Sequence, residues 1–497
     1  MQKLGLVLVV ASLTLMAACG SSGNGGGSSS ITSVTASCSP STILFGQTSQ
    51  CSATVTGTGN FSSGVTWMAS AGTISTSGLF TAPSGGGVSL QVTITATSTQ
   101  DTSKSGMTTV TVNPVQQANN VQPIVVDAGP PQLTQPSTNV AFTTVTVCVP
   151  GTTTCQSIDN VMVDTGSSGL RLISGVLNIS LPPENDSGGN PLDECLAFLD
   201  GYIWGPVATA TVTMSGETAS SVPVQIIIPS SSSPAVPSSC SAQNPPGGAG
   251  NEGGSSNSDS VATFGANGII GVGLFQQDCG PACTPGFQLQ PMYYDCPPSG
   301  CSETSVTLAQ QLPNPVTMFA TDNNGVLIQL PSVPNGGLAS VSGSLIFGIG
   351  TQSNNGLGSA TIYAVPGSLQ NNAGDFTTTF NGSSYPGFLD SGSNAFFFVD
   401  SSIPTCNQYW FCPTTSPLVL SAQNQGTNMT SGVPVSFTIE NENNLSGSNT
   451  AFSTLAGPYS STPSAFDWGL SFFFGRNVFT AIENRSTTGG TGPYFAY

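Results

Sequence analysis

Two short strings, DTGSS starting at Asp164 and DSGSN starting at Asp390, constrain the fold of this chain more than any other feature. Each string follows an apolar run and leads into another, residues 170–173 after the first and 395–399 after the second. This frame predicts a strand, a tight turn that carries the aspartate and a second strand, repeated twice. Paired carboxyls are also what water-activating hydrolysis needs. Two like charges held close together cannot both ionise, so one carboxyl acts as a base while the other keeps its proton.

The N-terminus predicts export and a lipid anchor. Residues 1–18 have the pattern of a secretion signal, with Lys3 followed by an apolar stretch. The string MAAC, which ends at Cys19, resembles the site at which bacterial lipoproteins are cleaved and lipidated. The Gly- and Ser-rich residues 19–31 suit a flexible tether, which plain secretion would not need. We therefore expect lipidation of Cys19 and a location in the bacterial cell envelope, anchored to the outer membrane or cell surface and outside the cytoplasm.

The cysteines agree with an oxidising compartment. The chain has 13 cysteines and no histidine, so setting Cys19 aside for lipid leaves an even number, which predicts disulfides. A metal site is not expected, because a mixed site would lack histidine ligands. Among the four clustered cysteines, pairing of Cys279 with Cys301 and of Cys283 with Cys296 is an open alternative. Spacing favours local pairs, which are Cys38 with Cys51, Cys148 with Cys155, Cys195 with Cys240, Cys279 with Cys283, Cys296 with Cys301, and Cys406 with Cys412.

The charge balance limits the partners. The chain has 5 Lys and Arg against 23 Asp and Glu, for a formal net charge of −18. No basic surface can be assembled from so few cations, so nucleic acid is excluded as a partner. Beyond the signal, no stretch is long and apolar enough to span a bilayer, so the lipid is the expected membrane contact. We expect no cofactor and a monomeric protein.

A separate β-sandwich is predicted over residues 32–113. Apolar and polar residues alternate there, as in residues 90–95, between Gly and Ser turns. The string VTWMASAGTISTSGLFTAP resembles bacterial Ig-like domains, which implies that Trp67 packs in a core and that the module is a spacer. Residues 114–120 are the expected linker.

The rest of the chain, residues 121–497, is predicted to be mostly β. Its β-branched and aromatic runs are separated by Gly, Pro, Asn and Ser, without long helical periodicity. This segment is large for a single core and suits two lobes. The low-complexity residues 230–260 predict a long surface loop.

Further strings in residues 121–497 resemble the landmarks of pepsin-like aspartic peptidases, in the same order. The resemblance implies an all-β, bilobal double-β domain with a cleft between an N-terminal lobe (121–312) and a C-terminal lobe (313–497). The chain also resembles an uncharacterised family of bacterial lipoproteins of unestablished function. The strings are FLDGYIWGPVATATVTM for the flap hairpin, NGIIGVGLF for the strand behind the first catalytic loop, GSLIFGIG for the start of the second lobe, and FDWGLSFFFGRNVFTAIEN for the closing segment.

The resemblance assigns roles to both turns. Asp164 and Asp390 are the implied catalytic dyad, which holds a nucleophilic water between the lobes. The supporting residues are Gly166 and Gly392, which permit the tight turns, Ser167 and Ser393, which donate hydrogen bonds to the carboxylates, and Thr165 and Ser391, which interlock beneath the dyad.

The flap departs from the family pattern. The tyrosine that normally donates a hydrogen bond toward the catalytic water falls on Phe198, which has no hydroxyl. Tyr202 and Trp204 are the nearby donors expected to replace it at the cleft.

Three other positions depart from the pattern. Ser391 replaces the commoner threonine, and Leu470 replaces the aspartate of the closing segment. Arg171 stands where the first lobe usually has tryptophan. We expect Arg171 either to pair with Asp200 or to drive both aspartates toward ionisation, which would impair acid catalysis.

The sequence therefore predicts a membrane-anchored aspartic endopeptidase that takes a peptide or protein into the cleft. One alternative is an inactive relative that binds peptide or glycan, because a fold alone does not grant chemistry. A surface adhesin or structural lipoprotein is the other. Retention of both aspartate strings favours the peptidase, while the departures at Phe198 and Leu470 favour the binding protein.

Overall fold

The computed structural model describes residues 28–83, 89–113, 119–186, 188–198, 201–241, 257–287, 292–459 and 463–497. The predicted signal, Cys19, Asp200 and most of the predicted tether and linker lie outside these residues. No helix in the described ranges is long and apolar enough to cross a membrane. The chain divides into two compact units, Met1–Gln116 and Gln117–Tyr497.

The first unit is a β-sandwich of two four-stranded sheets, with strand orders β1-β3-β6-β5 and β2-β8-β7-β4. Alternate residues of the strands face inward, and Phe80, Ile94 and Val110 form its core, with Trp67 packed against them. Cys38 and Cys51 are register partners on β1 and β3 and form a disulfide. The strands are β1 (Ser30–Ser39), β2 (Thr42–Leu44), β3 (Thr48–Thr58), β4 (Val65–Ala69), β5 (Thr73–Ile74), β6 (Leu79–Thr81), β7 (Leu90–Ser98) and β8 (Ser105–Asn113).

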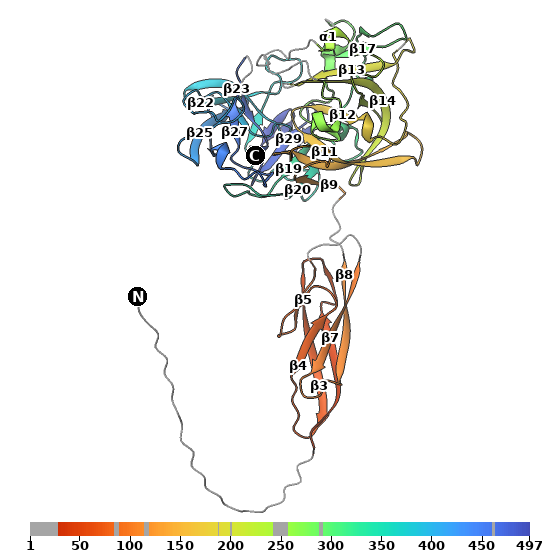
Figure 1. The fold of residues 1–497 in the computed structure, drawn as a ribbon, viewed down its shortest axis with the longest axis vertical. Coiled ribbons are helices and arrows are strands. Elements are labelled where there is room, and N and C mark those ends of the chain that lie inside the picture. The colour runs from red at the N-terminus through yellow and green to blue at the C-terminus, as the bar shows by residue number, and fades with distance from the viewer. Residues whose placement is uncertain are drawn as a thin grey trace, which may run out of the picture. The chain divides into compact units, whose positions relative to one another are not determined.

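The second unit has two lobes that share a central sheet. Figure 1 shows β12 and β14 in one lobe and β22 and β25 in the other, with β19, β20 and β29 between them. The shared strands run in the order β9-β20-β19-β29-β32-β21. They are β9 (Val121–Val126), β19 (Gly325–Gln329), β20 (Val341–Phe347), β21 (Ile362–Ala364), β29 (Asn477–Ala481) and β32 (Tyr494–Ala496), with η3 (Pro315–Met318) before β19 and the hairpin β30 (Ser486–Thr487) and β31 (Gly490–Thr491).

The first lobe continues the same sheet as β18-β17-β13-β14-β15-β12-β16-β11-β10. Its elements are β10 (Ala141–Cys148), β11 (Cys155–Asp164), β12 (Ser168–Ile173), η1 (Ser174–Val176), β13 (Leu192–Ala197), β14 (Tyr202–Met214), β15 (Glu217–Ile227), α1 (Ser238–Ser241), α2 (Val261–Phe264), β16 (Gly268–Val272), η2 (Gly280–Cys283), β17 (Tyr293–Asp295) and β18 (Ser302–Glu303).

The second lobe is a seven-stranded sheet in the order β26-β25-β22-β23-β28-β24-β27. Its base is aromatic: Phe466 stacks on Trp468 with ring centroids 4.4 Å apart and on Phe398 at 5.1 Å. The elements are β22 (Phe376–Phe380), β23 (Ser383–Leu389), β24 (Phe396–Phe398), β25 (Leu418–Gln425), β26 (Val433–Ile439), η4 (Glu442–Asn444), β27 (Ala456–Pro458), β28 (Phe466–Trp468) and η5 (Leu470–Phe472).

The same three-strand arrangement recurs in both lobes and positions the two aspartates. In the first lobe, β16 lies between β11 and β12, parallel to one and antiparallel to the other. In the second lobe, β28 lies in the same way between β23 and β24. Each aspartate lies where the first strand of its trio ends and the turn begins. The predicted all-β, bilobal fold is therefore confirmed.

The disulfides join the pairs that sequence spacing favours, including Cys279 with Cys283 and Cys296 with Cys301. The remaining pairs are Cys148 with Cys155, Cys195 with Cys240 and Cys406 with Cys412. Most of them close short loops at strand ends, where sequence neighbours are already close in space.

Candidate active site

The two turns hold their carboxyls in matching hydrogen-bond frames. Gly166 donates its backbone N–H to Oδ1 of Asp164 at 2.7 Å, and the Ser167 hydroxyl donates to Oδ2. In the second turn, the backbone N–H of Gly392 donates to Oδ1 of Asp390 and the Ser393 hydroxyl to Oδ2, both at 2.8 Å. Each carboxyl therefore has one backbone and one hydroxyl donor, which fix its orientation.

The two carboxyls lie together, each beside the glycine of the opposite turn. Asp164 and Asp390 form a side-chain hydrogen bond with each other. A Cβ placed on Gly166 would lie 2.8 Å from Cγ of Asp390, and one on Gly392 would lie 2.7 Å from Oδ1 of Asp164. Glycine is needed at these positions because the opposite carboxyl approaches the backbone, more than for the turn conformation predicted from the sequence.

Thr165 and Ser391 cross-link the two turns beneath the carboxyls. Oγ1 of Thr165 donates to the carbonyl oxygen of Leu389 at 3.0 Å and accepts from the N–H of Ser391 at 2.9 Å. Ser391 reciprocates: its Oγ donates to the carbonyl of Val163 at 2.8 Å and accepts from the N–H of Thr165 at 3.1 Å. Serine therefore keeps all the hydrogen bonds of the interlock, and the substitution removes only a methyl group.

Burial and charge favour a proton on the pair. Asp164 is only 5% exposed. Burial, and then the charge of Asp390, raises the pKa of Asp164 well above its usual range, against the donors Ser167 and Gly166. One shared proton relieves the repulsion between two such carboxyls, and the pair titrates as a unit.

Arg171 is paired with carboxylates other than Asp164 and Asp390, and its predicted place at the cleft is wrong. Its side chain is 0% exposed. It forms ion pairs with Glu194 on β13 at 2.6 Å and with Asp278 at 3.0 Å, and its Nη1 donates to the carbonyl of Ser168 at 2.8 Å. The hydroxyl of Tyr293 donates to Asp278. Arg171 thus ties the strand after the first turn to the strand that leads into the flap hairpin.

The residues expected at the flap are mostly committed to packing. Phe198, at the end of the β13–β14 hairpin, packs in an apolar cluster, with its ring centroid 6.3 Å from that of Phe264. Trp204 is 0% exposed, and its indole N–H donates to the carbonyl of Pro234 at 3.2 Å. Tyr202 is 5% exposed and belongs to the same buried cluster as Trp204. The expectation that Trp204 serves as a donor in the cleft is wrong, because its N–H already has a partner.

Sequence reasoning missed a third carboxyl beside the pair. Asp467 lies on β28 and is 1% exposed. Burial, and then the charges of Asp390 and Asp164, raise its pKa well above the usual range, while a hydrogen bond with Ser393 opposes the shift. The available signal was a single carboxylate inside an apolar run, in the string FDWGL. Leu470, just beyond it, is buried, and its backbone N–H donates to the carbonyl of Ser393 at 2.7 Å.

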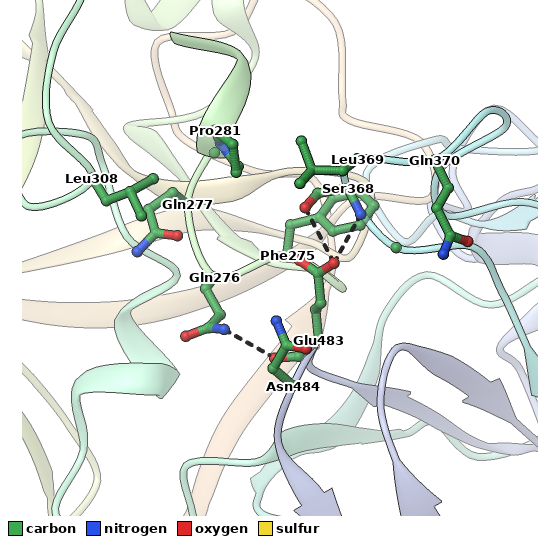
Figure 2. Close-up of a pocket in the computed structure, with 12 residues that line it drawn as sticks. Phe275, Gln276, Gln277, Pro281, Leu308, Ser368, Leu369, Gln370, Glu483 and Asn484 are labelled. Atoms are coloured by element: carbon green, nitrogen blue, oxygen red, sulfur yellow. Dashed lines mark hydrogen bonds between the residues drawn. The ribbon is translucent and has the colours of Figure 1, made fainter. Parts of the chain in front are cut away.

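A cavity of about 320 Å³ lies at the seam between the lobes and is drawn in Figure 2. The Ser368 N–H and hydroxyl both donate to Oε1 of Glu483, at 2.8 and 3.1 Å. The amide of Gln276 donates to the carbonyl of Glu483 at 3.1 Å. The cavity wall adjoins the first turn, because Oγ of Ser168 donates to the carbonyl of Phe275, a lining residue, at 2.8 Å. The cavity lining does not include either aspartate of the pair.

Within the described ranges, Cys406, Cys412 and Glu442 form a set of three metal-ligand atoms that all lie within 4.8 Å of one another. Both cysteines of this set are joined in a disulfide, so neither offers a thiolate.

The close approach at the second glycine gives a testable consequence. Gly392→Ala is expected to lower the kcat/KM of any reaction at the pair by about 100-fold, because the new methyl group displaces a carboxyl from its position. Gly447→Ala is the matched control, since a Cβ there meets nothing within 4 Å. Equal kcat/KM for the two variants would contradict the tight approach. Circular dichroism of both variants checks that they fold.

No curated protein matches this chain. One solved structure that it resembles, described as "Crystal structure of aspartic proteinase from Irpex lacteus", is 16% identical, with a TM-score of 0.45 over 76% of this chain and 96% of that chain. Residues 116–497 match the model of the family described as "Protein of unknown function (DUF3443)". Because this match covers most of the chain, the protein belongs to the DUF3443 family.

Proposed function

We propose that the protein is an aspartic endopeptidase that hydrolyses peptide bonds with a water held between Asp164 and Asp390. The observation that carries the proposal is the meeting of two turn carboxyls in matching donor frames, joined by the Thr165–Ser391 interlock. A lone pair of buried carboxyls could be structural. The duplicated frame fixes both carboxyls for one shared ligand, as general acid–base chemistry requires.

The proposed chemistry uses one proton on the pair. Asp164, whose pKa is raised by burial and by Asp390, holds that proton in the resting site. Asp390 then acts as the base and takes a proton from the water as the water oxygen attacks the peptide carbonyl carbon. Asp164 donates its proton to the carbonyl oxygen, which forms a neutral tetrahedral diol. When the C–N bond breaks, Asp390 returns a proton to the departing nitrogen, and Asp164 takes back the proton of the diol hydroxyl.

The cavity in Figure 2 supports a peptide as the ligand. Its lining carries the side-chain amides of Gln276, Gln277, Gln370 and Asn484. Amides offer both donors and acceptors, which suits a peptide backbone of any sequence. The contact between Ser168 and the carbonyl of Phe275 links this lining to the first catalytic turn.

A second candidate function is a binding protein that has lost catalysis. Phe198 favours it, because a phenyl ring cannot donate a hydrogen bond toward the catalytic water and is packed against Phe264. Such a protein would hold peptide in the same site without cleaving it.

Cleavage of unstructured peptides distinguishes the two functions. The purified full-length chain is expected to cleave a peptide library between about pH 3 and 7 with a bell-shaped pH profile, because one carboxyl must be ionised and the other protonated. Mass spectrometry of the products measures cleavage, and pepstatin is expected to inhibit it. Peptide binding without cleavage across that range would favour the binding protein. The absence of both binding and cleavage would contradict both candidate functions.

A further inference from the structure

Asp467 lies against the second catalytic turn. Its strand, β28, pairs with β23 and β24, with Asp467 opposite Phe388 and Phe397. The residues after it wrap the turn: the N–H of Asp390 donates to the carbonyl of Trp468 at 3.2 Å, and Leu470 donates to Ser393. Asp467 is therefore fixed by backbone hydrogen bonds beside Asp390.

The first lobe has no carboxyl in the equivalent place. Two residues before Asp164, Met162 pairs with Ile269 of β16. Two residues before Asp390, Phe388 pairs with Asp467 of β28. The strand trios otherwise repeat, so the carboxyl at Asp467 breaks the repetition at an apolar position.

Asp467 is buried without a counterion. Among the described residues, its Oδ1 has no hydrogen-bond partner. The ion pairs in that part of the chain both belong to Arg171, with Glu194 and Asp278. A buried ionised carboxylate without a cation is strongly unfavourable, so Asp467 is neutral in the resting site.

Ser393 connects Asp467 to the pair. Its hydroxyl donates to Oδ2 of Asp390 at 2.8 Å, and hydrogen bonding by the same side chain lowers the pKa of Asp467 against the effect of burial. A hydroxyl has one proton to give. Ser393 gives that proton to Asp390 and so cannot stabilise an ionised Asp467 at the same time, which leaves Asp467 protonated and links the charge states of Asp467 and Asp390 through one hydroxyl.

We propose that Asp467 is a positioning residue that holds a proton beside the catalytic pair, acts on Asp390 through Ser393 and extends the working range of the pair to higher pH. This inference rests on the proposed peptidase function. It adds a third carboxyl that shares protons with Asp164 and Asp390 and makes no contact with the substrate.

Among the described residues, Asp390 and Asp164 are the charged groups that act on Asp467. β24 contributes Phe396, Phe397 and Phe398, and η5 contributes no titratable residue. β23 carries Tyr385, which pairs with Thr378 and precedes Leu389, the last residue of the strand, by four residues. Asp390 follows β23, and Asp164 comes from the opposite turn.

The sign of the pH effect follows from like-charge repulsion. As the pH rises, each proton lost from Asp164, Asp390 or Asp467 adds a negative charge that makes the loss of the next proton harder. Replacing Asp467 with a neutral residue removes one of these charges, so Asp164 loses its proton at lower pH. The alkaline limb of the activity profile should then move down, while the acid limb, where Asp467 is protonated, should stay in place.

The test measures kcat/KM against pH for the full-length chain and three variants. Asp467→Asn and Asp467→Ile, the latter copying Ile269, are expected to move the alkaline limb down by about one pH unit or more. Asp375→Asn is the matched control, since burial alone raises the pKa of Asp375 to about 7 and no interaction with the pair contributes. An unmoved limb in both Asp467 variants, with cleavage intact, overturns the inference and leaves the peptidase function standing.

A double-mutant cycle decides the inference without any cleavage. The thermal stability of Asp164→Asn, Asp467→Asn and the double variant is measured at pH 7, beside the same cycle with Asp375→Asn. If the two carboxyls repel each other, the gain in thermal stability of the double variant should be smaller than the sum of the gains of the two single variants, because each substitution relieves the same repulsion. The Asp375 cycle should be additive. A wild-type chain that cleaves nothing would contradict the peptidase function. An additive Asp164–Asp467 cycle would overturn the inference, whether or not the chain cleaves peptides.

Discussion

Replacing either Asp164 or Asp390 with asparagine is expected to lower peptide cleavage by at least about 10²- to 10⁴-fold, the usual contribution of a general acid or base. Asparagine keeps the size of the side chain and can still accept from the Gly166 or Gly392 N–H, but it cannot take up or release the catalytic proton. The measurement is kcat/KM on the best library peptide at the optimum pH. Cleavage that survives either substitution would rule out the dyad as the catalytic group.

The same variants carry an internal check on folding. The folded-state pKa of Asp164 is raised, so the wild-type protein loses stability as the pH rises from the unfolded value of about 3.9 through the folded value. Asp164→Asn removes that loss, and its thermal stability relative to wild type should grow between about pH 4 and 7. An inactive variant that is equally or more stable at pH 7 identifies a lost proton carrier and excludes a misfolded protein.

The sequence predicts the two aspartate-bearing turns well because they are local and repeated. The donors of Asp164 lie within three residues of it, and those of Asp390 follow the same spacing. Duplication then implies a two-fold meeting point. The interlock joins Thr165 and Ser391, which lie 226 residues apart, and it was predictable only through the family resemblance.

The partners of Arg171 could not be predicted in this way. Glu194 is 23 residues away and Asp278 is 107, and neither belongs to a recognisable string. The pairing depends on how β13 and the loop after β16 pack over β12. A lone buried cation in an acidic chain predicts that some carboxylate must approach it, but not which one.

Asp467 was missed for a different reason. Its segment was recognised as the strand of the closing landmark, which fixes the place of the backbone but not the meaning of a polar residue within it. Its neighbours on β28, Phe466 and Trp468, are both buried. A carboxyl between two buried aromatic residues, on a strand that borders an aspartate-bearing turn, is the signal that such a sequence offers, and it indicates a group whose charge interacts with that aspartate.

Arg171→Met is expected to destabilise the second unit by about 3 to 5 kcal/mol, because it leaves Glu194 and Asp278 buried without their cation. Denaturant unfolding followed by tryptophan fluorescence measures this loss, since Trp204 and Trp468 are fully buried in that unit. Arg485→Gln removes the same charge and should cost far less, because Nη2 of Arg485 donates a 3.2 Å hydrogen bond to a backbone carbonyl, that of Thr317, and forms no ion pair with any described residue.

The pH dependence and a rescue separate the ion cluster from simple loss of packing. Burial, and then the charge of Glu194, already raises the pKa of Asp278 well above its usual range, against the effect of Arg171. Without Arg171 that pKa rises further, so the loss of stability should grow as the pH rises above about 4, the unfolded value. Adding Glu194→Gln and Asp278→Asn to Arg171→Met removes the uncompensated charges and should restore much of the stability. A loss that is independent of pH and is not rescued would mean that Arg171 acts through its packing volume, and the ion pairs would then not explain how β12 is held to β13.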